Sequence, residues 1–85
     1  MNRTRSVSFA EFGRFLQSIG FSRKRAETAW VFHHETEGLL IFRLYRADEA
    51  VDEGDLRSTR KFLDLRGLLE AKDFDAFVQE ASAPA

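Results

Sequence analysis

The chain has 85 residues, a formal net charge of -1 and no cysteine. Without cysteine neither a disulfide framework nor a thiolate metal site is possible, and no apolar run in the sequence is long enough to span a membrane. Nine Phe, one Trp and one Tyr supply the large side chains that so short a chain needs for a core. We therefore expect a cytoplasmic protein with a single α+β domain at residues 8–81, a flexible basic segment at 1–7 and a frayed tail at 82–85.

The first predicted element is a helix over residues 8–19. Ser8 and Glu11 have the spacing of a capping box, in which the serine hydroxyl accepts a hydrogen bond from the glutamate N–H. Gly20 stands where the left-handed residue that ends a helix is favoured. Between these signals the apolar residues recur with the period of a helix, at Phe9, Phe12, Phe15, Leu16 and Ile19.

An antiparallel sheet is predicted to follow the helix. Residues 28–35 alternate as a strand does, with Trp30, Phe32 and His34 on one face and Ala29, Val31 and His33 on the other. After a turn, residues 39–45 are predicted to form a second strand. Because two strands alone are only marginally stable, we expect residues 21–26 to add a third strand at the start of the sheet.

Two helices are predicted after an acidic connection at residues 46–54. Asp52 is placed to cap the first of them, which ends at Gly67, and Asp73 is placed to cap the second. The complete order is α-β-β-β-α-α, with the helices on one face of a three-stranded antiparallel sheet. The predicted core contains Phe12, Leu16, Ile19, Phe32 or Val31, Phe42, Leu63 and Phe77.

The small net charge hides a strong separation of charge along the chain. Residues 1–25 carry six Lys/Arg and one carboxylate, whereas residues 26–55 carry two Arg and eight carboxylates. Such polarity favours an electrostatically steered contact, with nucleic acid at the basic end or with a protein partner at either end, and the acidic connection suits a basic protein. A solvated surface whose charges happen to segregate explains the same pattern.

Two basic groups are the candidate RNA-binding residues. One group follows the first helix and the other lies on the second predicted helix; their members are Arg23, Lys24 and Arg25, and Arg57, Arg60 and Lys61. If both helices pack on one face of the sheet, the two groups can flank a shared edge and contact phosphates. The alternative is that these exposed cations serve solubility alone.

The histidine pair is the candidate catalytic site. His33 or His34 can act as a general acid or base, because imidazole titrates near neutral pH. Neighbouring residues of a strand point to opposite faces, so the two side chains cannot hold one metal ion without other ligands. No metal or cofactor is therefore expected. The alternative reading is two polar residues near the end of a hairpin, and Trp30 can likewise either stack on a base or pack in the core.

The chain has a helix that ends in IGF, followed by the hairpin AWVFHHETEGLLIF. In these segments and in the order of its elements, it resembles the HicA (YcfA-type) mRNA interferase toxins over residues 8–69. The resemblance implies an α-β-β-β-α fold like that of a double-stranded-RNA-binding domain. Members of this family cleave mRNA without a metal, using a histidine of a Gly-Ser-His segment on the second strand. A HicB-type antitoxin holds them inactive, so the resemblance also implies a toxin-antitoxin system.

The catalytic segment of the family differs in this chain. Aligning Phe32 with the strand phenylalanine of the family puts residues 27–29, Glu-Thr-Ala, in place of Gly-Ser-His. Ala29 cannot transfer a proton, so a contribution of about 10²–10⁴-fold to the rate would be lost. We therefore expect a non-catalytic or weakly active HicA-like domain that binds RNA or a protein partner such as a HicB-type antitoxin. The alternatives are an active RNA endonuclease that uses His33 or His34, and a domain that binds only proteins.

Overall fold

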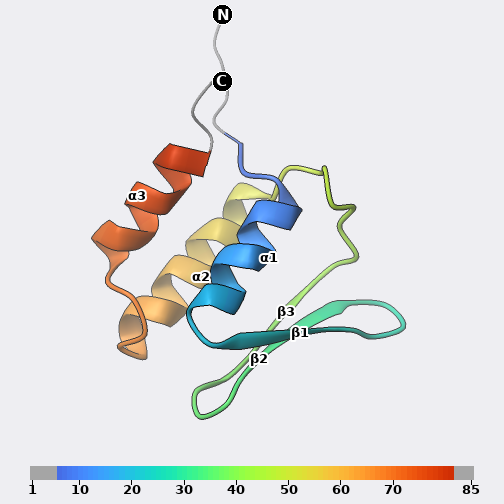
Figure 1. Cartoon of the computed structure of the whole chain (residues 1–85), viewed down its shortest axis with the longest axis horizontal. Coiled ribbons are helices and arrows are strands. Elements are labelled where there is room, and N and C mark those ends of the chain that lie inside the picture. Colours follow the sequence, from blue (N-terminus) through green and yellow to red (C-terminus); the bar gives the residue numbers. More distant parts are fainter. Residues whose placement is uncertain (1–5, 82–85) are drawn as a thin grey trace, which may run out of the picture.

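The computed structural model describes residues 6–81, and its helices and strands follow the predicted order (Figure 1). They are α1 (Phe9–Ser18), β1 (Phe21–Arg25), β2 (Trp30–His34), β3 (Gly38–Phe42), α2 (Glu53–Leu65) and α3 (Ala71–Ala81). The predictions for residues 1–5 and for the tail at 82–85 lie outside the described residues. Val7, which belongs to the predicted N-terminal segment, is fully buried.

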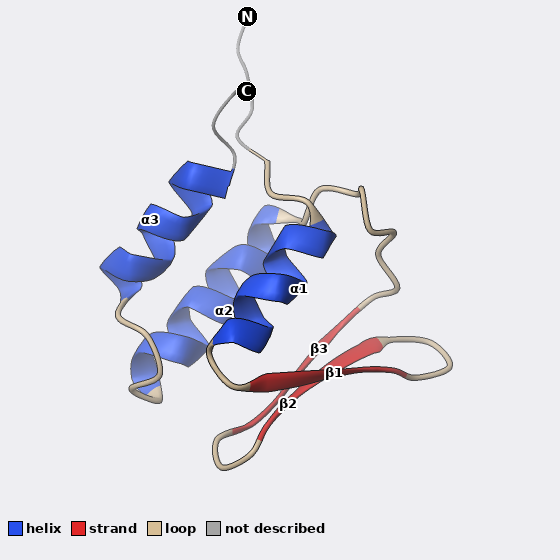
Figure 2. Ribbon diagram, viewed as in Figure 1, coloured by secondary structure: helices blue, strands red, loops and turns tan. Residues whose placement is uncertain are grey.

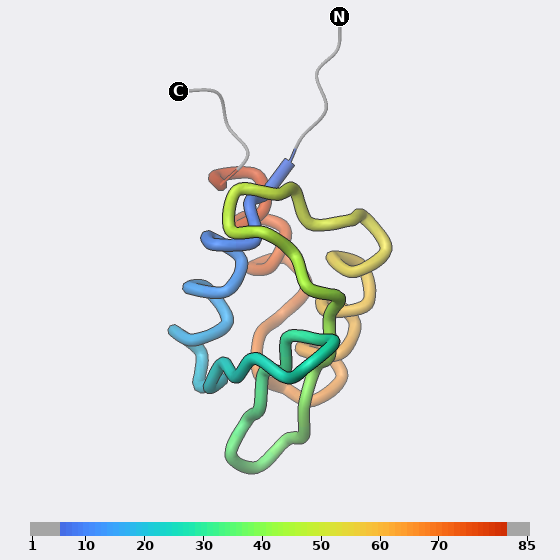
Figure 3. Tube along the Cα trace, turned by 90° about the vertical axis from the view of Figure 1, so that its right-hand side faces the viewer, coloured from blue at the N-terminus to red at the C-terminus, as the bar shows by residue number. Residues whose placement is uncertain are grey.

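The three strands form one antiparallel sheet in the order β1-β2-β3. In its register, Phe32 of the central strand lies between Arg23 of β1 and Leu40 of β3. The helices lie on one face of the sheet (Figure 2), where α1 and α2 are nearest to the strands and α3 packs on their far side (Figures 1 and 3). This arrangement confirms the predicted α+β fold. The other face of the sheet is open in the described part of the chain.

The start of α1 is capped by a side chain and by a distant loop. The Ser8 hydroxyl accepts a hydrogen bond from the N–H of Glu11 at 3.2 Å, as the capping box predicts. The N–H of Phe9 donates to the carbonyl of Glu49 at 2.8 Å. Because the first N–H groups of a helix have no partner inside it, the connection between β3 and α2 completes the N-terminus of α1.

The core is built around the ring of Phe9. Its centroid lies 5.0–6.3 Å from the centroids of five other rings, those of Phe12, Trp30, Phe32, Phe42 and Tyr45. The predicted core residues that are buried are Phe12, Leu16, Phe32, Phe42 and Leu63. Ile19 and Phe77 are only half-buried. On α3 it is Phe74 that is buried, while Phe77 stacks on Phe15 of α1 with centroids 3.9 Å apart.

Both predicted hairpin strands are longer than the strands that form. β2 begins at Trp30 rather than at residue 28, and β3 ends at Phe42 rather than at residue 45. Continued alternation predicts Tyr45 on the open face, but this residue turns inward and is only 3 % exposed. The chain leaves the sheet early because Tyr45 stacks on Phe9, with ring centroids 5.0 Å apart, and so adds a ring to the core.

The two predicted aspartate caps are corrected by the structure. Asp52 occupies the cap position of α2, but its side chain caps no N–H and lies instead 3.5 Å from Nε of Arg43. α3 begins at Ala71, before the predicted cap at Asp73. The N–H of Ala71 donates to Oδ1 of Asp64 on α2 at 3.3 Å. Asp73 therefore lies in the first turn of α3, where a negative charge is favourable.

Thr59 offers a test of the packing between α2 and the core. Its side chain is fully buried, and its hydroxyl has no hydrogen-bond partner in the described residues. An unsatisfied buried hydroxyl costs about 1–3 kcal/mol. Thr59→Val keeps the shape and removes the hydroxyl, so we expect the free energy of unfolding in urea to rise by about 1 kcal/mol.

The control for this variant is Ser58→Val, an exposed position on the same helix. Ser and Val have similar helix propensities, so this change is expected to stay within about 0.5 kcal/mol. A Thr59→Val variant less stable than the parent would show that the hydroxyl makes a hydrogen bond in solution.

Candidate functional site

Strand β1 presents the first basic group on an edge of the sheet. All of its side chains except the first are exposed. The register places Arg23 and Arg25 on the helix side of the sheet and Lys24 on the open side. None of these three cations forms an ion pair with a carboxylate of residues 6–81. Their charge is therefore available to an anionic ligand.

Arg23 is positioned by the side chain of Trp30. Its guanidinium lies 5.3 Å from the centroid of the indole ring, a distance at which the ring attracts a cation. The indole is itself held, because Nε1 donates to the carbonyl of Tyr45 at 3.1 Å and the ring lies 5.8 Å from that of Phe9. Trp30 thus packs at the margin of the core and orients Arg23.

The second basic group lies on α2, where Arg57 and Arg60 line an open groove of about 490 Å³ between α2 and α3. Lys61 is exposed and does not line this groove. Arg60 donates to both carboxylate oxygens of Asp75, at 2.8 and 3.0 Å, and this hydrogen bonding raises the pKa of Arg60. α3 packs on the side of the helices away from the sheet (Figure 1). The two basic groups therefore lie on different surfaces rather than along one edge.

The two histidines lie on opposite faces of β2. His33 is exposed on the open face, whereas His34 is half-buried on the helix side. Nδ1 of His34 accepts hydrogen bonds from the N–H groups of Thr36 and Glu37 at 3.2 and 3.3 Å, so this ring holds the β2–β3 turn. Ala29, which the resemblance to the HicA toxins aligns with their histidine, lies just before β2. Among residues 6–81 no group of three or more His, Asp or Glu could hold a metal ion.

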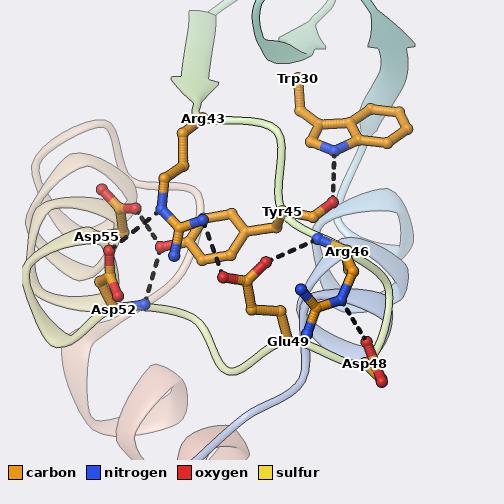
Figure 4. Close-up of polar contacts among 8 residues, drawn as sticks. All are labelled: Trp30, Arg43, Tyr45, Arg46, Asp48, Glu49, Asp52 and Asp55. Atoms are coloured by element: carbon orange, nitrogen blue, oxygen red, sulfur yellow. Dashed lines mark hydrogen bonds and ion pairs between the residues drawn. The ribbon is translucent and has the colours of Figure 1, made fainter.

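A polar cluster that the sequence analysis does not predict holds the connection between β3 and α2 (Figure 4). This Tyr45 cluster consists of Arg43, Tyr45, Glu49, Asp52 and Asp55. The Tyr45 hydroxyl donates to Oδ2 of Asp55 at 2.6 Å and accepts from the N–H of Asp52 at 2.8 Å. The Arg43 guanidinium lies 3.9 Å from the centroid of the Tyr45 ring and 3.0 Å from Oε2 of Glu49. Each polar group of the cluster thus restrains the same loop.

The cluster reduces the negative charge that the connection presents. The backbone N–H of Arg46 and the Arg43 guanidinium both hydrogen-bond Glu49 and lower its pKa, and Glu49 in turn raises the pKa of Arg43. Arg46 also pairs with Asp48 at 3.4 Å. Three of the four carboxylates of residues 46–54 therefore already have a cationic partner, and Glu53 has none among the described residues. A signal for this pairing exists in the sequence, because Arg43 and Arg46 are the only cations of residues 26–55.

No protein-family model matches this chain, and neither a curated protein nor a solved structure matches it. Within residues 6–81, no helix has the length and apolar character needed to cross a membrane.

Tyr45 allows the cluster to be tested by alkaline titration. Burial, followed by the hydrogen bond to Asp55, raises the pKa of Tyr45 from 10.0 to about 12. The fold thus favours the neutral phenol, whose contribution to stability is complete below pH 10 and is lost as the pH rises toward about 12. Because the chain has one Tyr, phenolate absorbance should titrate well above pH 10.0 in the folded protein and near pH 10.0 in urea.

Tyr45→Phe is the matched variant for this titration. It keeps the ring that stacks on Phe9 and removes the hydroxyl, so we expect the free energy of unfolding at pH 7 to fall by about 1–2 kcal/mol. The difference in the free energy of unfolding between this variant and the parent should shrink as the pH rises from 10.0 toward about 12. An equal phenolate midpoint in the folded protein and in urea would show that the hydroxyl is not held by the cluster.

Proposed function

We propose that this chain is a non-catalytic, HicA-like binding domain of a toxin-antitoxin-type system, and that its basic sheet edge binds RNA. The observation that supports this most is that β1 carries three adjacent exposed cations, none of which pairs with a carboxylate in the described chain. Arg43, Arg46 and Arg60, in contrast, each pair with a carboxylate. A phosphate backbone supplies the anions that this edge lacks.

The edge suits contacts with phosphates better than contacts with bases. Arg23 and Arg25 project to one side of β1 and Lys24 to the other, so the strand forms a ridge of positive charge. Reading of RNA bases commonly uses aromatic platforms, and the ring beside Arg23, that of Trp30, packs against Phe9. Binding is therefore weak, indifferent to sequence and strongly dependent on salt.

The side chains that could cleave RNA are not gathered at this edge. General acid–base cleavage needs a proton-transferring group within hydrogen-bond reach of the reacting atoms. His34 is engaged by the backbone of the β2–β3 turn, and His33 lies on the opposite face of the strand. Ala29 has no group that transfers a proton. Binding without chemistry is the function that this geometry favours.

Salt dependence tests the proposed edge. Replacing Arg23, Lys24 and Arg25 together by Gln removes up to three phosphate contacts. The slope of log K against log[salt] for a short RNA duplex should then flatten by at most about 2–3 units, since each contact contributes about 0.7–0.9. Titrations of a duplex and of a single strand at several salt concentrations measure this slope.

The matched control is the double variant Arg57→Gln, Lys61→Gln on α2. These residues lie on another surface, so the slope should change by much less than in the β1 variant. An equal loss in both variants would mean that RNA crosses both surfaces and that β1 is not the site. The absence of RNA binding at low salt would instead favour the domain that binds only proteins.

Ribonuclease activity separates binding from cleavage. The purified chain should leave a mixed RNA substrate intact, because the family histidine is replaced by Ala29. The comparison is with the double variant His33→Ala, His34→Ala on the same substrate. Robust cleavage by the parent that the double variant loses would establish the endonuclease alternative and contradict the proposal.

A further inference from the structure

The two edges of the sheet differ in how they are protected against pairing. An edge strand carries unpaired backbone N–H and C=O groups, and charged side chains oppose its pairing with another strand. β1 carries three cations, whereas β3 has no charged residue from Gly38 to Phe42. On the open face of β3, Leu39 is 47 % exposed and Ile41 is 62 % exposed. β3 is therefore the edge that is suited to pairing.

The sequence of β3 is complementary to itself in the antiparallel direction. A two-fold axis through Leu40 places Leu39 of each copy opposite Ile41 of the other. All four side chains then lie on the open face, because residues directly opposite in a sheet share a face. If the register between the two copies were shifted by one residue, the open face of one copy would continue into the helix side of the other. Leu39 and Ile41 would then lie beside side chains of the helix side of the second copy. The competing registers are therefore those shifted by two residues.

Charges at the ends of β3 select one of these registers. With the axis at Leu40, Glu37 of one copy lies opposite Arg43 of the other at both ends of the paired strands, just outside β3. Arg43 also pairs with Glu49 and Asp52 of its own copy, so its guanidinium is shared between these carboxylates and Glu37 of the other copy. The registers shifted by two residues place Glu37 opposite Ile41, or Leu39 opposite Arg43, so neither brings Glu37 opposite Arg43. Pairing of β1 with itself would instead bring like charges together, which is destabilising.

We infer that β3 pairs with β3 of a second copy of this chain, antiparallel and centred on Leu40. The product is a continuous six-stranded sheet with the helices of both copies on one side. A five-residue strand buries less surface than a standard protein interface, so the association is concentration-dependent rather than permanent. It does not depend on the proposed binding of RNA, because β1 stays free at both outer edges.

Sedimentation equilibrium of the full chain tests the association, over concentrations from about 10 µM to about 1 mM. The average mass of the parent should rise from that of the monomer toward that of the dimer. Ile41→Lys places a cation at the paired edge and should weaken the dimer at least tenfold, about 1.4 kcal/mol. Glu37→Lys puts like charges at both ends and should also weaken it, more strongly at low salt.

The matched control is Leu65→Lys, which places the same charge on an apolar residue of α2 that is 71 % exposed. It should associate as the parent does, and circular dichroism should show an unchanged fold in all variants. A parent that stays monomeric at 1 mM would overturn the inference. So would an association that Leu65→Lys and Ile41→Lys weaken equally.

Disulfide cross-linking tests the register. Because the chain has no cysteine, a single introduced cysteine can cross-link only with its equivalent in a second copy. Opposite Cα atoms in an antiparallel pair lie about 4.5–5.5 Å apart, within the range that a disulfide spans. Leu40→Cys should therefore form covalent dimers under mild oxidation at least about tenfold faster than Leu39→Cys, whose equivalent lies diagonally. Faster cross-linking of Leu39→Cys would exclude the axis at Leu40.

Discussion

Tyr45 connects α1, β2, the start of α2 and the loop between β3 and α2, and the rest of the fold depends on these contacts. Its ring stacks on Phe9 of α1 with centroids 5.0 Å apart and planes 14° apart. Its carbonyl accepts from the indole of Trp30 on β2, and its hydroxyl meets Asp52 and Asp55 at the start of α2. The same connection provides the carbonyls that cap α1. One residue therefore couples the helix layer, the sheet and the loop between them, in a chain that has no cysteine to form a disulfide.

The candidate site could be predicted from the sequence only in part. The exposure of Arg23, Lys24 and Arg25 follows from their place on a short strand beside a single neighbour, which is a local property. The division of this group between two faces of the sheet also follows from strand alternation. In contrast, the pairing of Arg60 with Asp75 depends on how α3 docks on α2, and no local pattern specifies that docking. Cations that look equivalent in the sequence thus differ in the fold, because Arg60 has a carboxylate partner and the cations of β1 have none in the described chain.

The fold was predictable wherever the signal lay within one element. The capping box at Ser8 and the alternation of β2 act over a few residues, and both are present in the structure. The errors arise where a distant partner decides the outcome. Tyr45 leaves the predicted strand because Phe9 offers it a stacking surface, and α3 starts at Ala71 because Asp64 of another helix accepts its N–H. Intrinsic preference is a weak guide at such positions.

The turn after α1 and the turn between β2 and β3 are linked through two residues. Gly20 has a φ of 108°, and a Cβ at this position would lie 2.9 Å from Nε2 of His34. The His34 ring cannot move away freely, because its other nitrogen accepts the N–H groups of Thr36 and Glu37. The effect of a substitution at position 20 therefore depends on the residue at position 34, but a change at position 34 relieves only part of the conflict. A smaller residue at position 34 would remove the steric conflict, but the positive φ would still require glycine at position 20.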